Sequence, residues 1–192
     1  MKKIIIFILF SLIAYSSVKA QAYFATDRGS LELGGNIYLL SGGGEAFEDA
    51  DGNRTFRFNL NPEFMIFVVP SLAVGAELQL SFYSSGDYSN NTVGIGPALT
   101  YYIAGHRDQK LYPYVGVSYL FTSYSYNYSS SDSGGDSRNT ITTPKLGLLV
   151  MLSDAVAMNA EFNYRSYNFD IGDSPESGNE LYIGIGIKAF IF

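Results

Sequence analysis

Eight charged side chains recur within segments of alternating apolar and polar residues. The acidic residues are Glu32, Glu63, Glu77 and Glu161, and the basic residues are Arg57, Lys145, Arg165 and Lys188. Each shares one face of its segment with small or polar residues, as Arg57 and Glu63 do with Asn59 and Asn61. An unpaired charge that is removed from water costs several kcal/mol, so equal numbers of both signs favour ion pairs in an enclosed space. We therefore expect these eight residues to form a charge-paired network inside the protein.

The charges lie on eight segments that have the pattern of β-strands. Neighbouring side chains of a strand point to opposite faces, which produces alternation with a period of two. The segments span residues 30–40, 55–68, 72–82, 93–103, 111–124, 140–152, 155–167 and 180–192. Each is longer than the average strand of about 5–6 residues and is long enough to cross a membrane at a tilt. The prediction is an all-β fold, an eight-stranded antiparallel up-and-down transmembrane β-barrel.

The connections between these segments differ in length. Those after odd-numbered segments are long and polar, at residues 41–54, 84–91, 125–139 and 168–179, whereas the others span only 69–71, 104–110 and 153–154. Barrels of the bacterial outer membrane have long extracellular loops and short periplasmic turns. Both chain termini are therefore expected on the periplasmic side. The acidic loop 41–54 and the Tyr/Ser-rich loop 125–139 are candidates for contact with a surface ligand.

The first twenty residues have the pattern of a cleavable export signal. Lys2 and Lys3 precede the apolar run 4–14, and Val18-Lys19-Ala20 fits a small-residue cleavage site. The apolar run is too short for a spanning helix, which needs about 20 residues. We expect residues 1–20 to be removed, with Gln21 as the first mature residue and residues 21–192 as the barrel domain. Loss of three lysines changes the net charge from −6 to −9, and an acidic chain without a basic cluster argues against nucleic-acid binding.

Alternation alone leaves two orientations of the faces open. A soluble lipocalin-like barrel would hold the apolar face inside, whereas a membrane barrel turns it towards lipid. The apolar face is built of bulky residues on all eight segments, and the polar face is rich in Gly, Ala, Ser, Thr and Asn. Because the interior of eight strands is only just wide enough for side chains, this composition favours the membrane orientation. Aromatic residues at the segment ends are predicted to form interfacial girdles: Phe56, Phe82, Tyr83, Tyr101, Phe121, Tyr164, Tyr167 and Phe190.

Three short motifs carry a family resemblance. They are Asn61-Pro62-Glu63-Phe64, then Leu72-Ala73-Val74-Gly75 after a short turn, and Pro113-Tyr114-Val115-Gly116-Val117. With them, the mature chain resembles the small outer-membrane β-barrel domain family that includes outer-membrane protein X and the barrel of outer-membrane protein A. The resemblance implies location in the bacterial outer membrane, contact with its lipid, and no shared catalytic residues or cofactor. It also implies that Phe192 is the C-terminal aromatic signal for the barrel-assembly machinery.

The register of the last segment has an inconsistency. Phe190 and Phe192 alternate in step with Lys188 rather than with Ile185 and Ile187. Either a bulge near Ala189 resets the alternation, or one of these faces is assigned incorrectly.

Taken together, these features favour a monomeric structural or surface-interaction barrel without catalysis. A narrow channel for water or small ions is the alternative, in which the charges would gate the interior. An enzyme acting on envelope lipid ranks third. The single histidine, His106, lies in a connection that we place on the periplasmic side, whereas barrel enzymes of the outer membrane resemble one another in using an extracellular histidine. Residues 48–53 are only weakly similar to a calcium loop, because they lack its spacing and its terminal Glu.

Overall fold

The computed structural model describes residues 24–42, 55–86, 88–103, 109–128, 131–171 and 174–192. The predicted export signal, most of loop 41–54 with its calcium-like residues, and His106 lie outside the described residues. Among the described residues, no helix is long and apolar enough to cross a membrane.

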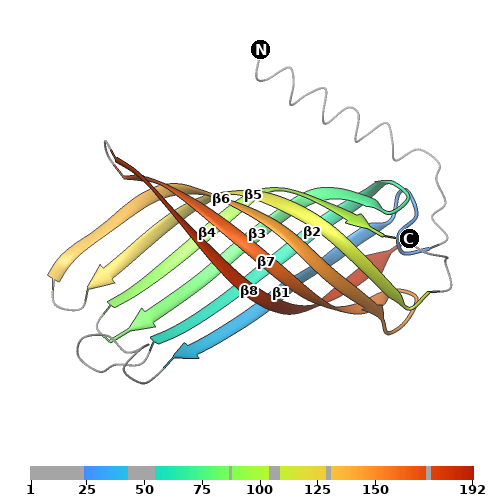
Figure 1. The fold of residues 1–192 in the computed structure, drawn as a ribbon, viewed down its shortest axis with the longest axis horizontal. Coiled ribbons are helices and arrows are strands. Elements are labelled where there is room, and N and C mark those ends of the chain that lie inside the picture. Colours follow the sequence, from blue (N-terminus) through green and yellow to red (C-terminus); the bar gives the residue numbers. More distant parts are fainter. Residues whose placement is uncertain (1–23, 43–54, 87, 104–108, 129–130, 172–173) are drawn as a thin grey trace, which may run out of the picture.

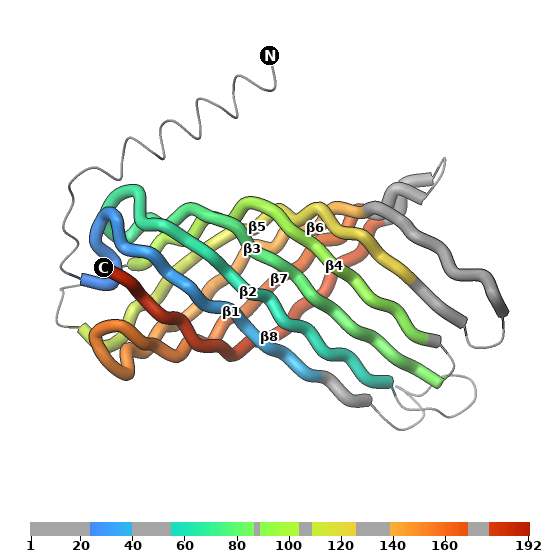
Figure 2. Tube along the Cα trace, turned by 180° about the vertical axis from the view of Figure 1, so that it is seen from behind, coloured from blue at the N-terminus to red at the C-terminus, as the bar shows by residue number. Residues whose placement is uncertain are grey.

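The described chain forms a single closed β-barrel. Its strands are β1 (Leu31–Gly42), β2 (Thr55–Val69), β3 (Leu72–Ser85), β4 (Tyr88–Tyr102), β5 (Leu111–Tyr128), β6 (Ser131–Met151), β7 (Val156–Ile171) and β8 (Ser174–Ile191). Each strand pairs antiparallel with the next, and β1 pairs with β8 to close the sheet (Figure 1). The predicted fold class is confirmed. We call the end that holds Phe192 the terminal end and the opposite end the hairpin end (Figure 2).

Three of the predicted long loops are largely strand. The β3–β4 ladder continues to Ser85↔Tyr88, the β5–β6 ladder to Tyr128↔Ser131 and the β7–β8 ladder to Ile171↔Ser174. The loop predictions for 84–91, 125–139 and 168–179 were therefore wrong. These segments are mostly polar, yet backbone hydrogen bonds can extend a ladder without a continuous apolar face. At the hairpin end, the strands therefore extend further than the sequence pattern predicts.

The apolar face of the strands points out of the barrel. Ile183 is 68% exposed and Phe64 is 52% exposed, whereas Asn59 and Gln79 on the polar face are 1% and 2% exposed. A lipocalin-like barrel would show the reverse. The membrane orientation is therefore confirmed, because only a hydrocarbon surrounding favours so large an apolar exterior.

An apolar cluster fills the barrel at the terminal end. We call it the terminal plug, and its buried members are Ala25, Met65, Phe67, Ala73, Ala98, Tyr102, Tyr112, Tyr114, Leu149, Ala157 and Phe190. Residues 24–30 lie across this end, held by hydrogen bonds from the Gly29 amide to the Phe67 carbonyl (2.8 Å) and from the Ser71 amide to the Thr26 carbonyl (2.9 Å). The inward face at this level is apolar, unlike the polar face that the rest of the barrel presents.

The alternation of β8 continues unbroken past Ala189. Phe190 is 3% exposed and its ring lies 6.3 Å from that of Phe67, so it belongs to the terminal plug. The face of Phe190 was the misassigned one, and its predicted place in an interfacial girdle was wrong. Tyr83 and Tyr167 also point inward, where Tyr83 lies beneath the Arg57 guanidinium and Tyr167 donates a hydrogen bond to Glu180. Phe192 follows the end of β8 and is 48% exposed.

Truncation of Phe190 should destabilise the barrel by opening a cavity in the terminal plug. We expect Phe190→Ala to lower the free energy of unfolding by about 3–5 kcal/mol. The matched control is Ile191→Ala, whose side chain is 55% exposed on the outer surface and should cost much less. Urea unfolding in phospholipid vesicles measures both. Equal losses for the two variants would contradict the inward placement of Phe190.

Candidate functional site

A layer of charged side chains lies next to the terminal plug. We call it the central charge layer, and it consists of Glu32, Glu63, Glu77, Glu161, Lys145 and Lys188. These residues come from β1, β2, β3, β6, β7 and β8, and each is at most 6% exposed. Their strands bring them to one level, because Glu63 and Glu77 are register partners and Lys188 pairs with Gly34, two residues from Glu32.

The two lysines link three carboxylates into an alternating chain. Lys188 Nζ lies 2.6 Å from Glu32 Oε1 and 3.0 Å from Glu63 Oε2. Lys145 Nζ bonds to Glu63 Oε1 and lies 3.0 Å from Glu77 Oε2. Glu63 therefore bridges both cations. Ion pairs in a low-dielectric interior interact much more strongly than they do in water, so this chain holds five strands together through four ion pairs.

Neutral donors compensate for the shortage of cations in this layer, which holds four carboxylates and two lysines. The Tyr102 hydroxyl donates to Glu32 Oε2 and the Tyr114 hydroxyl to Glu161 Oε1, both at 2.6 Å. Asn159 Nδ2 also donates to Glu161 (3.2 Å), and Asn61 Nδ2 donates to Glu77 (3.1 Å). Hydrogen bonds to charged groups contribute more than those between neutral groups, so these donors stabilise the excess negative charge.

Gly147 makes the position of Tyr114 possible. The two residues are register partners on β6 and β5, and a Cβ added at Gly147 would lie 2.1 Å from the Tyr114 ring. Any residue with a side chain at position 147 would therefore displace the Tyr114 ring. Because position 147 is glycine, the Tyr114 ring can lie over its register partner, and its hydroxyl can reach Glu161.

A second group of charges lies nearer the hairpin end. We call it the outer cluster; it consists of Arg57, Arg165 and Glu180 with the tyrosines around them. Glu180 accepts hydrogen bonds from Arg57, from the Tyr38 hydroxyl (2.9 Å) and from the Tyr167 hydroxyl (2.7 Å). Arg165 Nη1 lies 4.0 Å from the same carboxylate.

Arg165 is also held by aromatic contacts. Its Nη2 donates to the Tyr182 hydroxyl at 2.7 Å, and its guanidinium lies 4.6 Å from the centre of the Tyr182 ring. A guanidinium over an aromatic face is attracted by the ring quadrupole. Arg165 is 1% exposed, so these contacts replace part of the water that the cation has lost, while its buried Nε has no hydrogen-bond partner.

The structure divides the eight predicted residues between two layers. Six form the central charge layer, and Arg57 and Arg165 belong to the outer cluster. Sequence reasoning missed Glu180, which is the partner of both arginines. The alternation could have identified it, because Glu180 has the same parity as Lys188 in β8. Tyr102 and Tyr114 were missed because counts of charge ignore neutral hydroxyl donors.

A polar cavity of about 500 Å³ adjoins the outer cluster, and we call it the outer chamber. Its lining includes Arg57, Asn59, Gln79, Thr92, Thr122 and Glu180. Both amide atoms of Asn59 and the carbonyl oxygen of Gln79 lack a hydrogen-bond partner although they are buried. Among the described residues, no group of three or more acidic or histidine side chains could hold a metal ion.

The chain matches a known protein family over most of its length. The family model described as outer membrane protein beta-barrel domain matches residues 8–188. The chain belongs to this family. It is a β-barrel protein of the bacterial outer membrane, and membrane lipid surrounds its apolar outer surface.

Solved structures of outer-membrane proteins share this fold. The N-terminal β-barrel domain of Pseudomonas aeruginosa OprF is 15% identical, with a TM-score of 0.56, over 85% of this chain and 98% of that one. Neisserial surface protein A (NspA) is 13% identical, with a TM-score of 0.51, over 84% of this chain and 96% of that one. At these identities the likeness concerns the fold alone. The comparison with curated proteins gives no match.

Removal of Lys188 should destabilise this outer-membrane barrel strongly. Lys188→Met leaves Glu32 and Glu63 buried without their shared cation, so we expect a loss of about 3–5 kcal/mol in the free energy of unfolding. Glu32→Gln in the Lys188→Met background should recover part of this loss, as a double-mutant cycle measures. Lys110→Met, at an exposed position, is the control and should change stability little. Additive effects of Lys188→Met and Glu32→Gln would refute the coupling.

Proposed function

We propose that this protein is a structural, surface-interaction barrel of the outer membrane with a closed, charge-paired interior and no catalysis. The observation that carries this proposal is the succession of two filled layers across the barrel. Tyr102 and Lys188 are both fully buried, one in the terminal plug and one in the central charge layer. A continuous water path would have to displace an apolar cluster and also separate buried ion pairs.

The hairpin end supports a role in surface contact. The β5–β6 ladder pairs residues 125–128 with the segment 131–136, with Ser125 opposite Asp136 and Tyr128 opposite Ser131. The Tyr, Ser, Gly and Asp composition of residues 125–139 is of the kind that makes adaptable contacts in binding loops. We propose that this segment and loop 41–54 contact a ligand outside the cell.

The remaining assignments follow from the same proposal. Residues 1–20 act as the export signal, residues 21–192 form a monomeric barrel, and both termini face the periplasm. Phe192 is exposed directly after β8, where an assembly factor could contact it. We propose that the barrel-assembly machinery recognises this residue together with the C-terminal strand.

A narrow channel is the second candidate, and the outer chamber is the observation that favours it. The chamber is a polar space that reaches the level of Gln79 and Asn59. Conduction would require the central charge layer and the terminal plug beneath it to open.

Single-channel recording in planar bilayers separates the two functions. We expect no steady conductance from the native barrel, because two filled layers close its interior; a general porin in the same membranes serves as the positive control. A steady current that Arg57→Ala or Glu77→Ala alters would instead establish a channel.

Deletion of the β5–β6 hairpin tests the surface role. We expect removal of residues 125–137 to abolish most binding of expressing cells to a ligand-bearing surface, since the barrel below keeps its ladders. The control is removal of residues 84–89 from the β3–β4 hairpin, which should leave binding in place. Heat-modifiable migration on semi-native gels reports folding of both variants. Unchanged binding by the folded 125–137 deletion would rule out this hairpin as the contact.

A further inference from the structure

The backbone ladder that closes the barrel covers only part of β1 and β8. Pairing runs from Leu31↔Ile191 to Ile37↔Ile185, although β1 continues to Gly42 and β8 begins at Ser174. On their other sides the same strands are paired to these ends, with Gly42↔Thr55 and Ile171↔Ser174. Within the described strands, β1 and β8 thus separate beyond Ile37 and Ile185, as Figures 1 and 2 show. We call this opening the β1–β8 split.

The split begins at the depth of the membrane. The outward residues beside it are apolar and highly exposed: Leu39 is 62%, Leu181 is 60% and Ile183 is 68% exposed. Unpaired backbone amides and carbonyls are costly in hydrocarbon, where no water is present to bond them. Polar side chains that reach the split from inside the barrel would therefore be favourable there, because they can form hydrogen bonds with these backbone groups.

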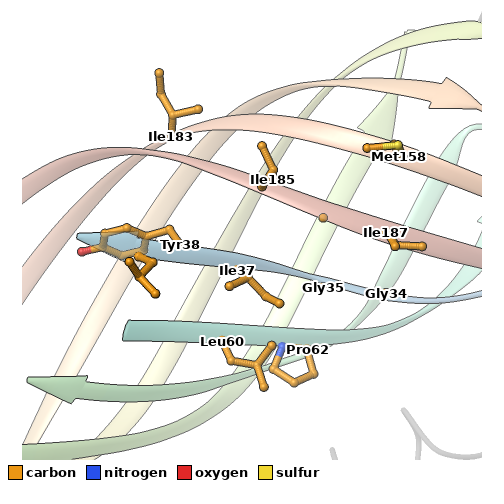
Figure 3. A pocket seen from close by; sticks show the side chains of 12 residues that line it. Gly34, Gly35, Ile37, Tyr38, Leu60, Pro62, Met158, Ile183, Ile185 and Ile187 are labelled. Atoms are coloured by element: carbon orange, nitrogen blue, oxygen red, sulfur yellow. The ribbon is translucent and has the colours of Figure 1, made fainter. Parts of the chain in front are cut away.

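Two cavities of opposite character lie near the split, one outside the barrel and one inside it. Outside lies an apolar groove of about 780 Å³, whose lining includes the backbone of Gly34 and Gly35 (Figure 3). Ile37, Met158 and Ile185 are among its apolar residues. Inside lies the polar outer chamber. Volumes of this size are typical of sites for small molecules.

Two tyrosines link the cavities. Tyr38 lines the groove, and its hydroxyl donates to Glu180, which lines the chamber. The rings of Tyr38 and Tyr182 stack across the split with centroids 4.7 Å apart. Side chains, rather than a ladder of backbone hydrogen bonds, therefore separate the chamber from the lipid at this point.

We propose that the β1–β8 split is a lateral portal that binds a single-chain anionic amphiphile, a long-chain carboxylate, with its tail in the groove and its head at the outer cluster. Glu180 is the only carboxylate among the described residues that pairs with Arg57 and Arg165, so the described charges of the outer cluster sum to one positive charge. The Arg57 side chain is 34% exposed and can meet a second carboxylate. Because the charge layer and the plug close the interior, a molecule that enters the chamber leaves sideways into the membrane.

Disulfide formation tests the split directly, since the chain contains no cysteine of its own. Leu33→Cys with Ala189→Cys joins register partners in the paired part, and we expect oxidation to link them fully in vesicles. Leu39→Cys with Ile183→Cys occupies the positions that would pair if the ladder continued, and we expect little linkage. Equal linkage of both pairs would show a closed seam and overturn the portal.

Photolabelling tests the ligand. A palmitate analogue with a photoactivatable group in its chain should label peptides with Leu39, Met158 and Ile183 about tenfold more than the opposite wall at Val93 and Phe121, a ratio equal to about 1.4 kcal/mol. Arg57→Gln should remove this preference, as should replacing the probe carboxylate by an alcohol. Lys110→Gln, at an exposed position, should leave it unchanged. Uniform labelling around the barrel, or a preference that survives Arg57→Gln in a folded barrel, would overturn the proposal.

Discussion

Backbone hydrogen bonding in a medium without water is the constraint on which this structure depends. A sheet in hydrocarbon must pair its amides and carbonyls within itself, and closure into a barrel achieves this without an edge. Closure of eight strands then creates an interior that only side chains can fill. The inward polar and charged residues must fill this narrow interior. Because water is scarce there, they contact one another in ways that neutralise their charges. The β1–β8 split is the one described place where the ladder stops at membrane depth, which is why it stands out chemically.

The interior is arranged in three levels with different chemistry. The terminal plug excludes water and so lowers the local dielectric, which strengthens the ion pairs in the adjoining central charge layer. The outer cluster lies beyond that layer and borders the polar outer chamber. Acidic and basic residues thus form buried ion pairs at one level and line a partly exposed cavity at another.

Much of this architecture could be predicted from period-two alternation, because strand geometry alone decides which face a residue occupies. That rule placed Glu63 and Lys145 on the inward face, and Phe64 and Ile183 on the outward one. It failed at Phe190, because an aromatic residue near a strand end was assigned to a girdle by type although its parity with Lys188 points inward. It also failed at the hairpins, where Ser- and Tyr-rich segments extend the ladders without a continuous apolar face to signal it.

Other features had no local signal in the sequence. The link between Tyr114 and Glu161 depends on residues 47 positions apart, and it needs the space beside Gly147. The separation of β1 from β8 beyond Ile37 depends on how far two strands at opposite ends of the chain stay paired. Alternation describes each strand by itself and contains no information on either.

Accessibility of spin labels along β2 tests most directly that the apolar face meets lipid around a filled interior. Single cysteines placed from residue 58 to residue 66 in the cysteine-free chain would each carry one label in a bilayer. The structure predicts high oxygen accessibility at Phe58, Leu60, Phe64 and Ile66, and low accessibility to both oxygen and a water-soluble relaxant at Asn61, Glu63 and Met65. High oxygen accessibility at the inward positions instead of the outward ones would contradict this account, as would free access of the water-soluble relaxant to Glu63 and Met65.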